Sequence, residues 1–305
     1  MVGDSGMTRG NTFGKTSRSD RGFYIICYSI ASILVLAVLY PMIYVVSCSF
    51  SSGIAVGAGK VWLWPVDFGL KGYKAVLKYK DIWIGYRNSI FYTVVGTFIN
   101  IFMTMICAYP LARKKLRGRS AIMMLFTFTM FFNGGMIPNY ILISKLNFIN
   151  TVWAMLIPGA MSVYNMIVAR TFLQSNIPDE LLESAKIDGC NDIHFFFKIV
   201  LPLSKTIIAV LCIWYAVGHW NSYFNAFLYL NEKSKYPLQI FLREILVLGD
   251  MQADMIDSES FLEVQSLKNL LKYSTIVVAT APLFAVYPFV QKYFVKGALI
   301  GSVKG

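Results

Sequence analysis

Six long apolar stretches, separated by more polar connections, constrain the fold of this chain more than any other feature of its sequence. They cover residues 23–50 and about 88–109, 121–143, 152–171, 203–220 and 273–293. A helix needs about 20 predominantly apolar residues to cross the hydrocarbon core of a membrane. Because backbone polar groups find no water inside a bilayer, such stretches cross it as helices. The sequence therefore predicts an all-α polytopic membrane protein with six transmembrane helices.

The composition excludes several other classes of protein. Of the 305 residues, 56% are apolar and 14% are charged, which is typical of an integral membrane protein. The net charge of +12 would indicate nucleic acid in a soluble protein, but basic membrane-flanking loops explain it here, and we expect no nucleic-acid partner. The five cysteines form no close pair and the two histidines lie in different segments, so we expect no metal site and no catalytic triad.

No phosphate-binding loop is evident in the chain. The nearest match, residues 57–60, has Ile54 and Val61 where the pattern needs glycine and serine or threonine. We therefore expect that this chain does not hydrolyse ATP and carries no cofactor of its own.

Basic residues indicate which connections lie in the cytoplasm. Half of the ten residues 111–120 are lysine or arginine and none is acidic, a strong signal for a cytoplasmic loop. Segments 1–22, 111–120, 170–205 and 291–305 together hold 16 of the 28 lysines and arginines. We therefore expect both termini in the cytoplasm. Residues 1–22 should form a flexible cytoplasmic tail and residues 23–305 a single transmembrane domain.

The cytoplasmic stretch 175–205 has the pattern of two short amphipathic helices. Pro178 suits a first helical turn, and Gly189 suits the turn between the helices. Asn191 or Asp192 can cap the second helix, and Pro202 stops or kinks it. An ordinary interfacial loop is the alternative interpretation of this pattern.

The spacing of seven residues in this stretch resembles the EAA loop of bacterial ABC importer permeases. That family's pattern is Glu-Ala-Ala, three residues, Gly, nine residues, Ile, one residue, Leu-Pro. This chain matches it, with serine for the middle alanine, at Glu183, Ser184, Ala185, Gly189, Ile199, Leu201 and Pro202. Segments 146–151, 220–221 and 296–305 resemble the carbohydrate branch of the family, the maltose-type permeases.

This resemblance implies a type I ABC importer permease fold in the bacterial cytoplasmic (inner) membrane. The EAA loop would form coupling helices that dock into a groove on an ATPase subunit. Glu183 would stabilise the loop or meet a cationic group of the ATPase, and Gly189 would permit the turn. Ile199, Leu201 and Pro202 would set the second helix against the body of the permease.

The resemblance also implies the partners. They are a second homologous permease subunit, two ATPase subunits that bind ATP and magnesium, and an extracytoplasmic solute-binding protein. The chain would be a non-catalytic subunit that moves a carbohydrate by alternating access. The acid-rich outer connection 221–272 would be either a docking surface for the binding protein or a solvated loop.

The sequence leaves the sugar open between neutral and acidic oligosaccharides. Five lysines of the first outer connection would suit an anionic ligand, and they would equally suit lipid headgroups. They are Lys60, Lys71, Lys74, Lys78 and Lys80.

A break in the third apolar stretch indicates where a solute pathway could lie. Gly134, Gly135 and Pro138 weaken a helix in lipid, and such breaks persist where they line a wet cavity or form a close-packing notch. Amides and aromatic rings suit the hydroxyls and C–H faces of a sugar, although aromatic residues also gather in interfacial belts. The candidate pathway residues are Asn133, Tyr164, Asn165, Tyr215, Trp220, Asn221 and Tyr223. We expect His219 to be a packing or interface residue.

The rival function is an ion-coupled secondary transporter of a small solute. Ion coupling usually needs an ionisable residue near the centre of a span, and none is evident there. A membrane enzyme, the third class, would need a convergent set of catalytic residues that the sequence does not show.

Overall fold

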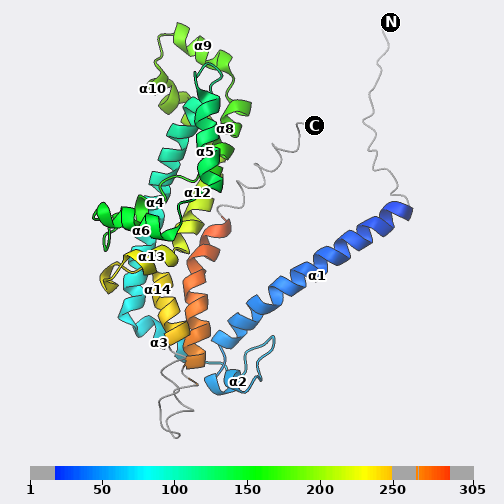
Figure 1. The fold of residues 1–305 in the computed structure, drawn as a ribbon. Coiled ribbons are helices and arrows are strands. Elements are labelled where there is room, and N and C mark those ends of the chain that lie inside the picture. The colour runs from blue at the N-terminus through cyan, green and yellow to red at the C-terminus, as the bar shows by residue number, and fades with distance from the viewer. Residues whose placement is uncertain (1–17, 249–265, 267, 289–305) are drawn as a thin grey trace.

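The computed structural model describes residues 18–248, 266 and 268–288, and every regular element within them is a helix. Three of these helices are uninterrupted and apolar enough to cross a membrane: α1 (Arg18–Ser49), α4 (Lys80–Ala112) and the helix Lys268–Pro288, orange in Figure 1. They correspond to the first, second and sixth predicted spans. Residues 18–22 of the predicted tail already belong to α1, and residues 1–17 lie outside the described part of the chain.

Two further spans are bent. Helices α5 (Arg119–Phe131) and α6 (Met136–Lys145) meet at 111°, and the segment Asp192–Leu203 meets α12 (Lys205–Trp220) at 79°. The first bend lies at the paired glycines, where Gly135 takes a φ of +88°. The sequence predicted a break at this place in the third apolar stretch.

The fourth apolar stretch is divided. Helix α7 (Trp153–Leu156) ends before Pro158 and Gly159, and α8 (Val163–Asn176) begins after Ser162, whose Oγ accepts a hydrogen bond from the Asn165 backbone N–H at 3.4 Å. The expectation of one continuous helix over 152–171 is therefore wrong. Proline lacks the N–H that the helix needs, and the adjacent glycine favours helix weakly, so the two together interrupt an otherwise apolar run.

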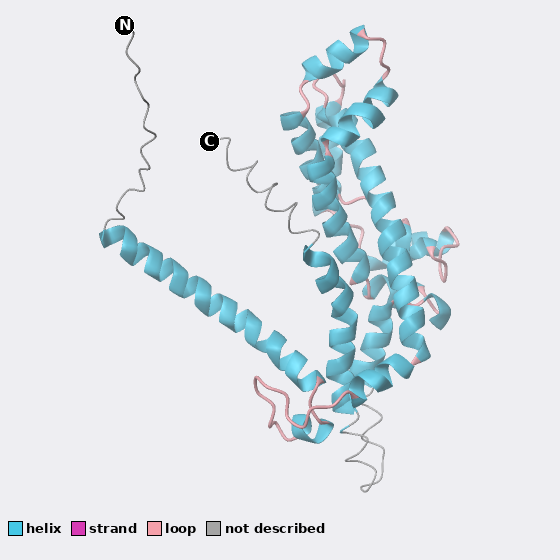
Figure 2. Cartoon of the chain, turned by 180° about the vertical axis from the view of Figure 1, so that it is seen from behind, coloured by secondary structure: helices cyan, strands magenta, loops and turns pink. Residues whose placement is uncertain are grey.

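Helix α4 is the axis of the bundle. It packs most extensively against α12 and α8, and the helix Lys268–Pro288 runs beside them in both views (Figures 1 and 2). The largest buried cluster of described residues joins α4, α8 and α12 and includes Met105, Met166 and Leu211. Where helices face water, burial of such apolar side chains is the main contribution to the stability of the interior. Within the bilayer, close van der Waals packing between helices takes this role.

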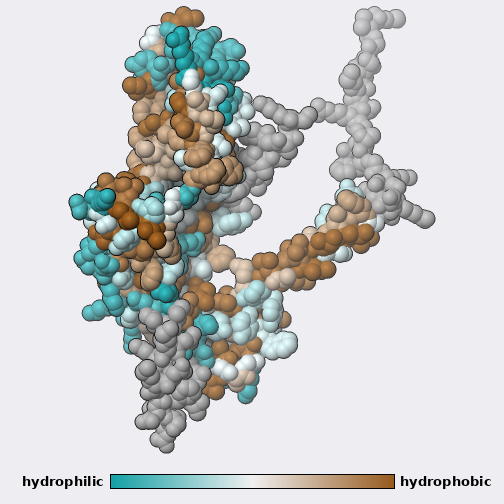
Figure 3. All heavy atoms as spheres, in the orientation of Figure 1, coloured by the Kyte–Doolittle hydropathy of each residue, from teal (hydrophilic) through white to brown (hydrophobic). Residues whose placement is uncertain are grey.

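Helix α1 stands apart from this bundle. It diverges from the other helices in Figures 1 and 2, and no residue of its most apolar window is buried. Figure 3 shows its surface as a nearly continuous hydrophobic band. Within the described part of the chain, α1 makes its contacts through its last turns, where Ser47 Oγ donates to the Leu63 carbonyl at 2.6 Å and the Tyr44 ring packs edge-on against Tyr273.

The two ends of the bundle differ. One end carries α9 (Asp179–Ile187) and α10 (Asp192–Phe195), and the opposite end carries α2, α3 and α14 (Figure 1). The remaining short elements are α2 (Gly53–Gly57), α3 (Lys71–Lys78), the π-helical turn η1 (Phe196–Val200), α11 (Leu201–Leu203), α13 (Phe224–Tyr229), the 3₁₀ turn η2 (Lys233–Lys235), α14 (Leu238–Arg243) and the π-helical turn η3 (Glu244–Leu248).

Candidate functional site

The stretch 175–205 forms the predicted helix pair. Pro178 immediately precedes α9, and Gly189 turns the chain between the helices with a φ of +79°. Asn191 caps α10 by accepting a hydrogen bond from the His194 backbone N–H at 2.7 Å. The chain then continues through Pro202 in α11 to the bend before α12. The prediction of two short helices joined by a glycine turn is confirmed.

One face of the helix pair is buried and the other is open. Ala185 and Phe195 lie in the main core cluster, and Ile199 and Leu201 pack against it, whereas Pro202 is exposed. Two of the three expected anchors of the second helix therefore hold it against the bundle. Ser184 is exposed and its Oγ donates to the Glu180 carbonyl at 3.0 Å, a bond within its own helix.

The open face carries large apolar side chains. Ile187 is 88% exposed and Ile193 is 72% exposed, on either side of the glycine turn. Both are apolar residues of short amphipathic helices, yet they are exposed and do not pack against the bundle. Exposed apolar side chains at a water-facing end are typical of a surface that a partner covers.

A basic loop holds the helix pair in place. The Arg113 guanidinium, at the end of α4, is 3.2 Å from Asp179 of α9 and lies over the rings of Tyr109 and Phe195, at 4.8 and 5.3 Å from their centroids. One arginine thus connects α4 with both short helices. The sequence indicates only the orientation of this loop, because no local pattern pairs residues that lie 66 positions apart.

Glu183 also pairs with the basic loop. Lys115 Nζ donates to Glu183 Oε1 at 2.6 Å, and this hydrogen bond raises the pKa of the lysine. Both side chains are more than half exposed, so the ion pair is accessible to solvent and to a partner. The expected role of Glu183 in stabilising the loop therefore has a geometric basis, and its role toward an ATPase stays a prediction.

Three predicted pathway residues lie in the packed interior of the subunit. The Tyr215 hydroxyl is 2.7 Å from Thr104 Oγ1 and accepts a hydrogen bond from the Ser162 backbone N–H at 3.1 Å. Trp220 is 5% exposed and its Nε1 donates to the Ala279 carbonyl at 3.3 Å, while Asn165 is 8% exposed. Tyr215 and Trp220 thus each contact a helix that is distant in sequence, and a role of these three residues in the pathway stays a prediction.

The other four candidates are accessible. Asn133 and Tyr164 are exposed, and Asn133 Oδ1 accepts a hydrogen bond from the Gly135 backbone N–H at 2.8 Å, which closes the turn before α6. Asn221 and Tyr223 line a cavity of about 550 Å³ at the end of α12. The structure thus divides the seven candidates between the interior and accessible surfaces.

His219 has the expected packing role. Its Nε2 is 2.6 Å from Asn100 Oδ1, and its ring lies directly against Gly96 of α4, where an added Cβ would approach within 2.4 Å of the ring nitrogen. The Asn100 amide also donates to the Gly159 carbonyl, so the interruption between α7 and α8 has a polar partner in α4.

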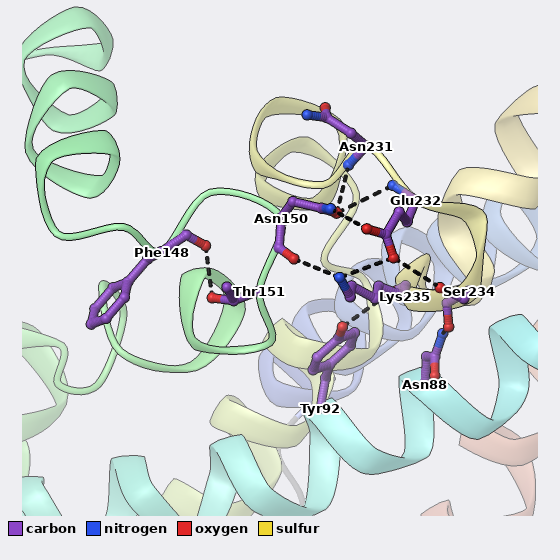
Figure 4. A network of polar contacts seen from close by, with 9 residues as sticks. All are labelled: Asn88, Tyr92, Phe148, Asn150, Thr151, Asn231, Glu232, Ser234 and Lys235. Atoms are coloured by element: carbon purple, nitrogen blue, oxygen red, sulfur yellow. Dashed lines mark hydrogen bonds and ion pairs between the residues drawn. The ribbon is translucent and has the colours of Figure 1, made fainter.

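A second polar network orders the opposite end of the bundle (Figure 4). Asn150, with a φ of +57°, accepts hydrogen bonds from the backbone N–H groups of Asn231 and Glu232 and donates to Glu232 Oε1 at 2.6 Å. Lys235 Nζ donates to the Asn150 carbonyl at 2.8 Å and pairs with Glu232. The hydrogen bonds from Lys235 and Asn150 hold the pKa of the Glu232 carboxyl below its ordinary value.

The fold and the helix pair α9–α10 define a class of protein: a multi-pass helical membrane subunit with a short helix pair anchored at one end of the bundle. The family model described as "Binding-protein-dependent transport system inner membrane component" matches residues 82–300, and the chain belongs to this family. It is therefore an ABC importer permease, which confirms the predicted fold class and its multi-pass placement in the membrane.

Relatives cover nearly the whole chain. The Bacillus subtilis polygalacturonan/rhamnogalacturonan transport system permease protein YtcP is 42% identical over 287 residues, which is 94% of this chain and 99% of that protein. The B. subtilis protein LplC is also 42% identical, over 88% of this chain and 90% of its own. A solved bacterial ABC transporter involved in import of the acidic polysaccharide alginate has a chain with a TM-score of 0.82 and 36% identity, covering 92% of this chain and 99% of that one.

Proposed function

We propose that this permease works in an ATP-driven importer of acidic carbohydrate fragments. The relatives named for polygalacturonan and for alginate act on polymers that carry carboxylates. Five exposed lysines near the opposite end from α9 supply a positive field that would attract such substrates. They are Lys60, Lys71, Lys74, Lys78 and Lys80.

The observation that carries the ATP-driven part of the proposal is the open face of α9 and α10. Ile187 and Ile193 present an apolar surface on a helix pair that Arg113 fixes to α4. A separate ATPase subunit, which binds ATP and magnesium, would cover these side chains. Because the helix pair is anchored to α4 and leads directly into α12, a movement of the docked ATPase would be passed to both spans.

Helix α1 supports a second permease subunit as the partner within the membrane. Its most apolar stretch has no buried residue. Among the described residues, its final turns hold it to the rest of the chain, for example through the Ser47–Leu63 hydrogen bond. A second homologous permease would pack against it, and two ATPase subunits and an extracytoplasmic binding protein would complete the assembly. Transport would proceed by alternating access, in which the pathway enclosed by the two permeases changes between inward-open and outward-open states. Both termini lie in the cytoplasm in this arrangement.

The docking surface can be tested by placing an amide on it. Ile187→Asn and Ile193→Asn should reduce retention of the ATPase on the purified permease and should lower binding-protein-stimulated hydrolysis. Ile54→Asn is a matched control, because Ile54 is 75% exposed at the opposite end of the bundle. If the two docking-end variants retain the ATPase as well as the control does, the proposed docking surface is wrong.

A further inference from the structure

A cavity of about 550 Å³ lies away from the coupling helices, between the end of α12, the start of α13, α14 and the helix Lys268–Pro288. Its volume falls within the range of about 300–1,000 Å³ that is usual for small-ligand sites. The residues that line it combine a cation, three amides or hydroxyls, an aromatic ring and aliphatic side chains. They are Asn221, Tyr223, Gln239, Leu242, Arg243, Leu246, Ile276, Ala279 and Thr280.

Arg243 is the charged group in this lining. Its guanidinium carbon lies 4.7 Å from the centroid of the Phe227 ring and 5.4 Å from that of Tyr223. These cation–π contacts place the guanidinium against two neighbouring aromatic rings and orient the group. They leave its N–H donors, which lie in the plane of the group, available for a ligand.

No carboxylate in the described part of the chain pairs with Arg243, and no hydrogen bond between described residues uses its N–H groups. Arg113 shows the contrasting case, because it also lies over aromatic rings but pairs with Asp179 at 3.2 Å. An arginine that is oriented by two rings and pairs with no anion among the described residues is prepared to bind an external one, since bidentate carboxylate binding matches its geometry.

The rest of the lining fits the body of a sugar. The amide of Asn221 donates its hydrogen to the Val217 carbonyl at 3.0 Å, which leaves the amide oxygen as an acceptor for a hydroxyl. Gln239 adds a second amide, and Tyr223 and the aliphatic residues provide apolar surface for the C–H face of a pyranose ring. The cavity therefore offers complementary groups for each part of a sugar acid.

We propose that this cavity is a binding subsite for one uronate residue of the transported chain, with the Arg243 guanidinium bound to its carboxylate. The inference rests on the proposed import of acidic carbohydrate and assigns part of the specificity for the acid to one residue. Removing the charge should then weaken handling of acidic sugars selectively.

The test uses the complete importer in proteoliposomes with its binding protein. Uptake is measured for a galacturonate trisaccharide and for the neutral galactose trisaccharide. Arg243→Gln should raise the half-saturating concentration of the acidic sugar about tenfold or more, as expected for loss of a charge-assisted hydrogen-bonded pair, and should leave the neutral sugar unchanged. Arg243→Lys should restore part of the difference. Arg87→Gln is the control, because Arg87 is exposed on α4 outside the cavity lining.

Three results would overturn the inference. Equal loss for both sugars would make Arg243 a structural residue, and an unchanged half-saturation for the acidic sugar would remove it from the pathway. Loss that disappears when anionic lipid is left out of the vesicles would identify a lipid headgroup as the occupant. If the unmodified importer moves the neutral sugar and not the acidic one, the proposed function itself fails, and this outcome is distinct from the first three.

Discussion

Gly189 has a backbone conformation that side chains strongly disfavour, yet it has open space around it. Its φ is +79°, and an added Cβ would meet no atom within 4 Å. Substitution therefore costs about 1 kcal/mol or more in backbone strain, and the added Cβ itself creates no clash inside the subunit. Any further effect of a larger side chain must come from a partner.

We expect Gly189→Val to leave the permease inserted and folded but to weaken ATPase docking or to uncouple hydrolysis from uptake. Gly59→Val is a matched control, because Gly59 also has a positive φ, of +66°, and open surroundings, at the opposite end of the bundle. ATPase retention, stimulated hydrolysis and uptake would be compared in the two purified assemblies. Equal behaviour of the two variants would show that 175–205 is an ordinary interfacial loop.

Two ion pairs connect the basic loop to α9, and their burial differs. The Arg113 side chain is 12% exposed in its pair with Asp179, whereas Lys115 is 80% exposed in its pair with Glu183. Removing one partner of a largely buried pair leaves the other charge poorly solvated, at a cost of about 1–3 kcal/mol, while an exposed pair contributes about 0–1 kcal/mol.

We therefore expect Arg113→Met to reduce the uptake achieved for each ATP hydrolysed, because α9 loses its connection to α4, and Lys115→Met to have little effect. A charge exchange, Arg113→Asp with Asp179→Arg, should recover part of the coupling if the ion pair is what transmits it. Uptake and hydrolysis measured in the same vesicles provide the ratio. A larger defect in the Lys115 variant would contradict this assignment.

At the scale of elements, the bend between α5 and α6 depends on a short turn. Asn133 accepts the hydrogen bond from the Gly135 N–H, and Gly135 takes the positive φ that starts α6 at 111° to α5. An asparagine bonded to the backbone two residues later is a recurrent way to fix such a turn.

Asn133→Leu should therefore loosen this bend by about 0.5–1.5 kcal/mol and impair uptake, while the ATPase remains bound. Asn139→Leu makes the same chemical change at an exposed position within α6 and should be tolerated. Transport and ATPase retention would be measured for both variants. Normal transport by the Asn133 variant would remove this residue from the predicted pathway.

At the scale of the whole molecule, the proposed orientation makes the two ends of the bundle face opposite sides of the membrane. Ser120 lies at the second residue of α5, near the α9 end, and Lys60 follows α2 at the other end; both are exposed. In a background without the native cysteines, Ser120→Cys should react with a membrane-impermeant thiol reagent only from the cytoplasmic side. Lys60→Cys should react only from outside. Reaction of both from one side would overturn the orientation.

The sequence by itself determined the features that depend on neighbouring residues. Runs of apolar residues predicted the membrane spans, the glycines at 134–135 predicted the break in the third, and Gly189 with Asn191 predicted the coupling helix pair. These are decided by side-chain polarity and backbone freedom within a turn or two. The same local chemistry divides the fourth stretch at Pro158 and Gly159, although the apolar length of that stretch predicts a single span.

Only the tertiary structure decided which residues meet. Tyr215 and Trp220 have the chemistry of a sugar site, yet contacts with Thr104 and Ala279 bury them inside the subunit. Ile187 has the spacing of a core residue but points outward. The pairing of Arg113 with Asp179 and the gathering of Arg243 with Asn221 likewise depend on how distant helices pack. Residue type constrains what a side chain can bind, but the packing of α4, α12 and their neighbours decides whether it faces a helix, a cavity or a partner.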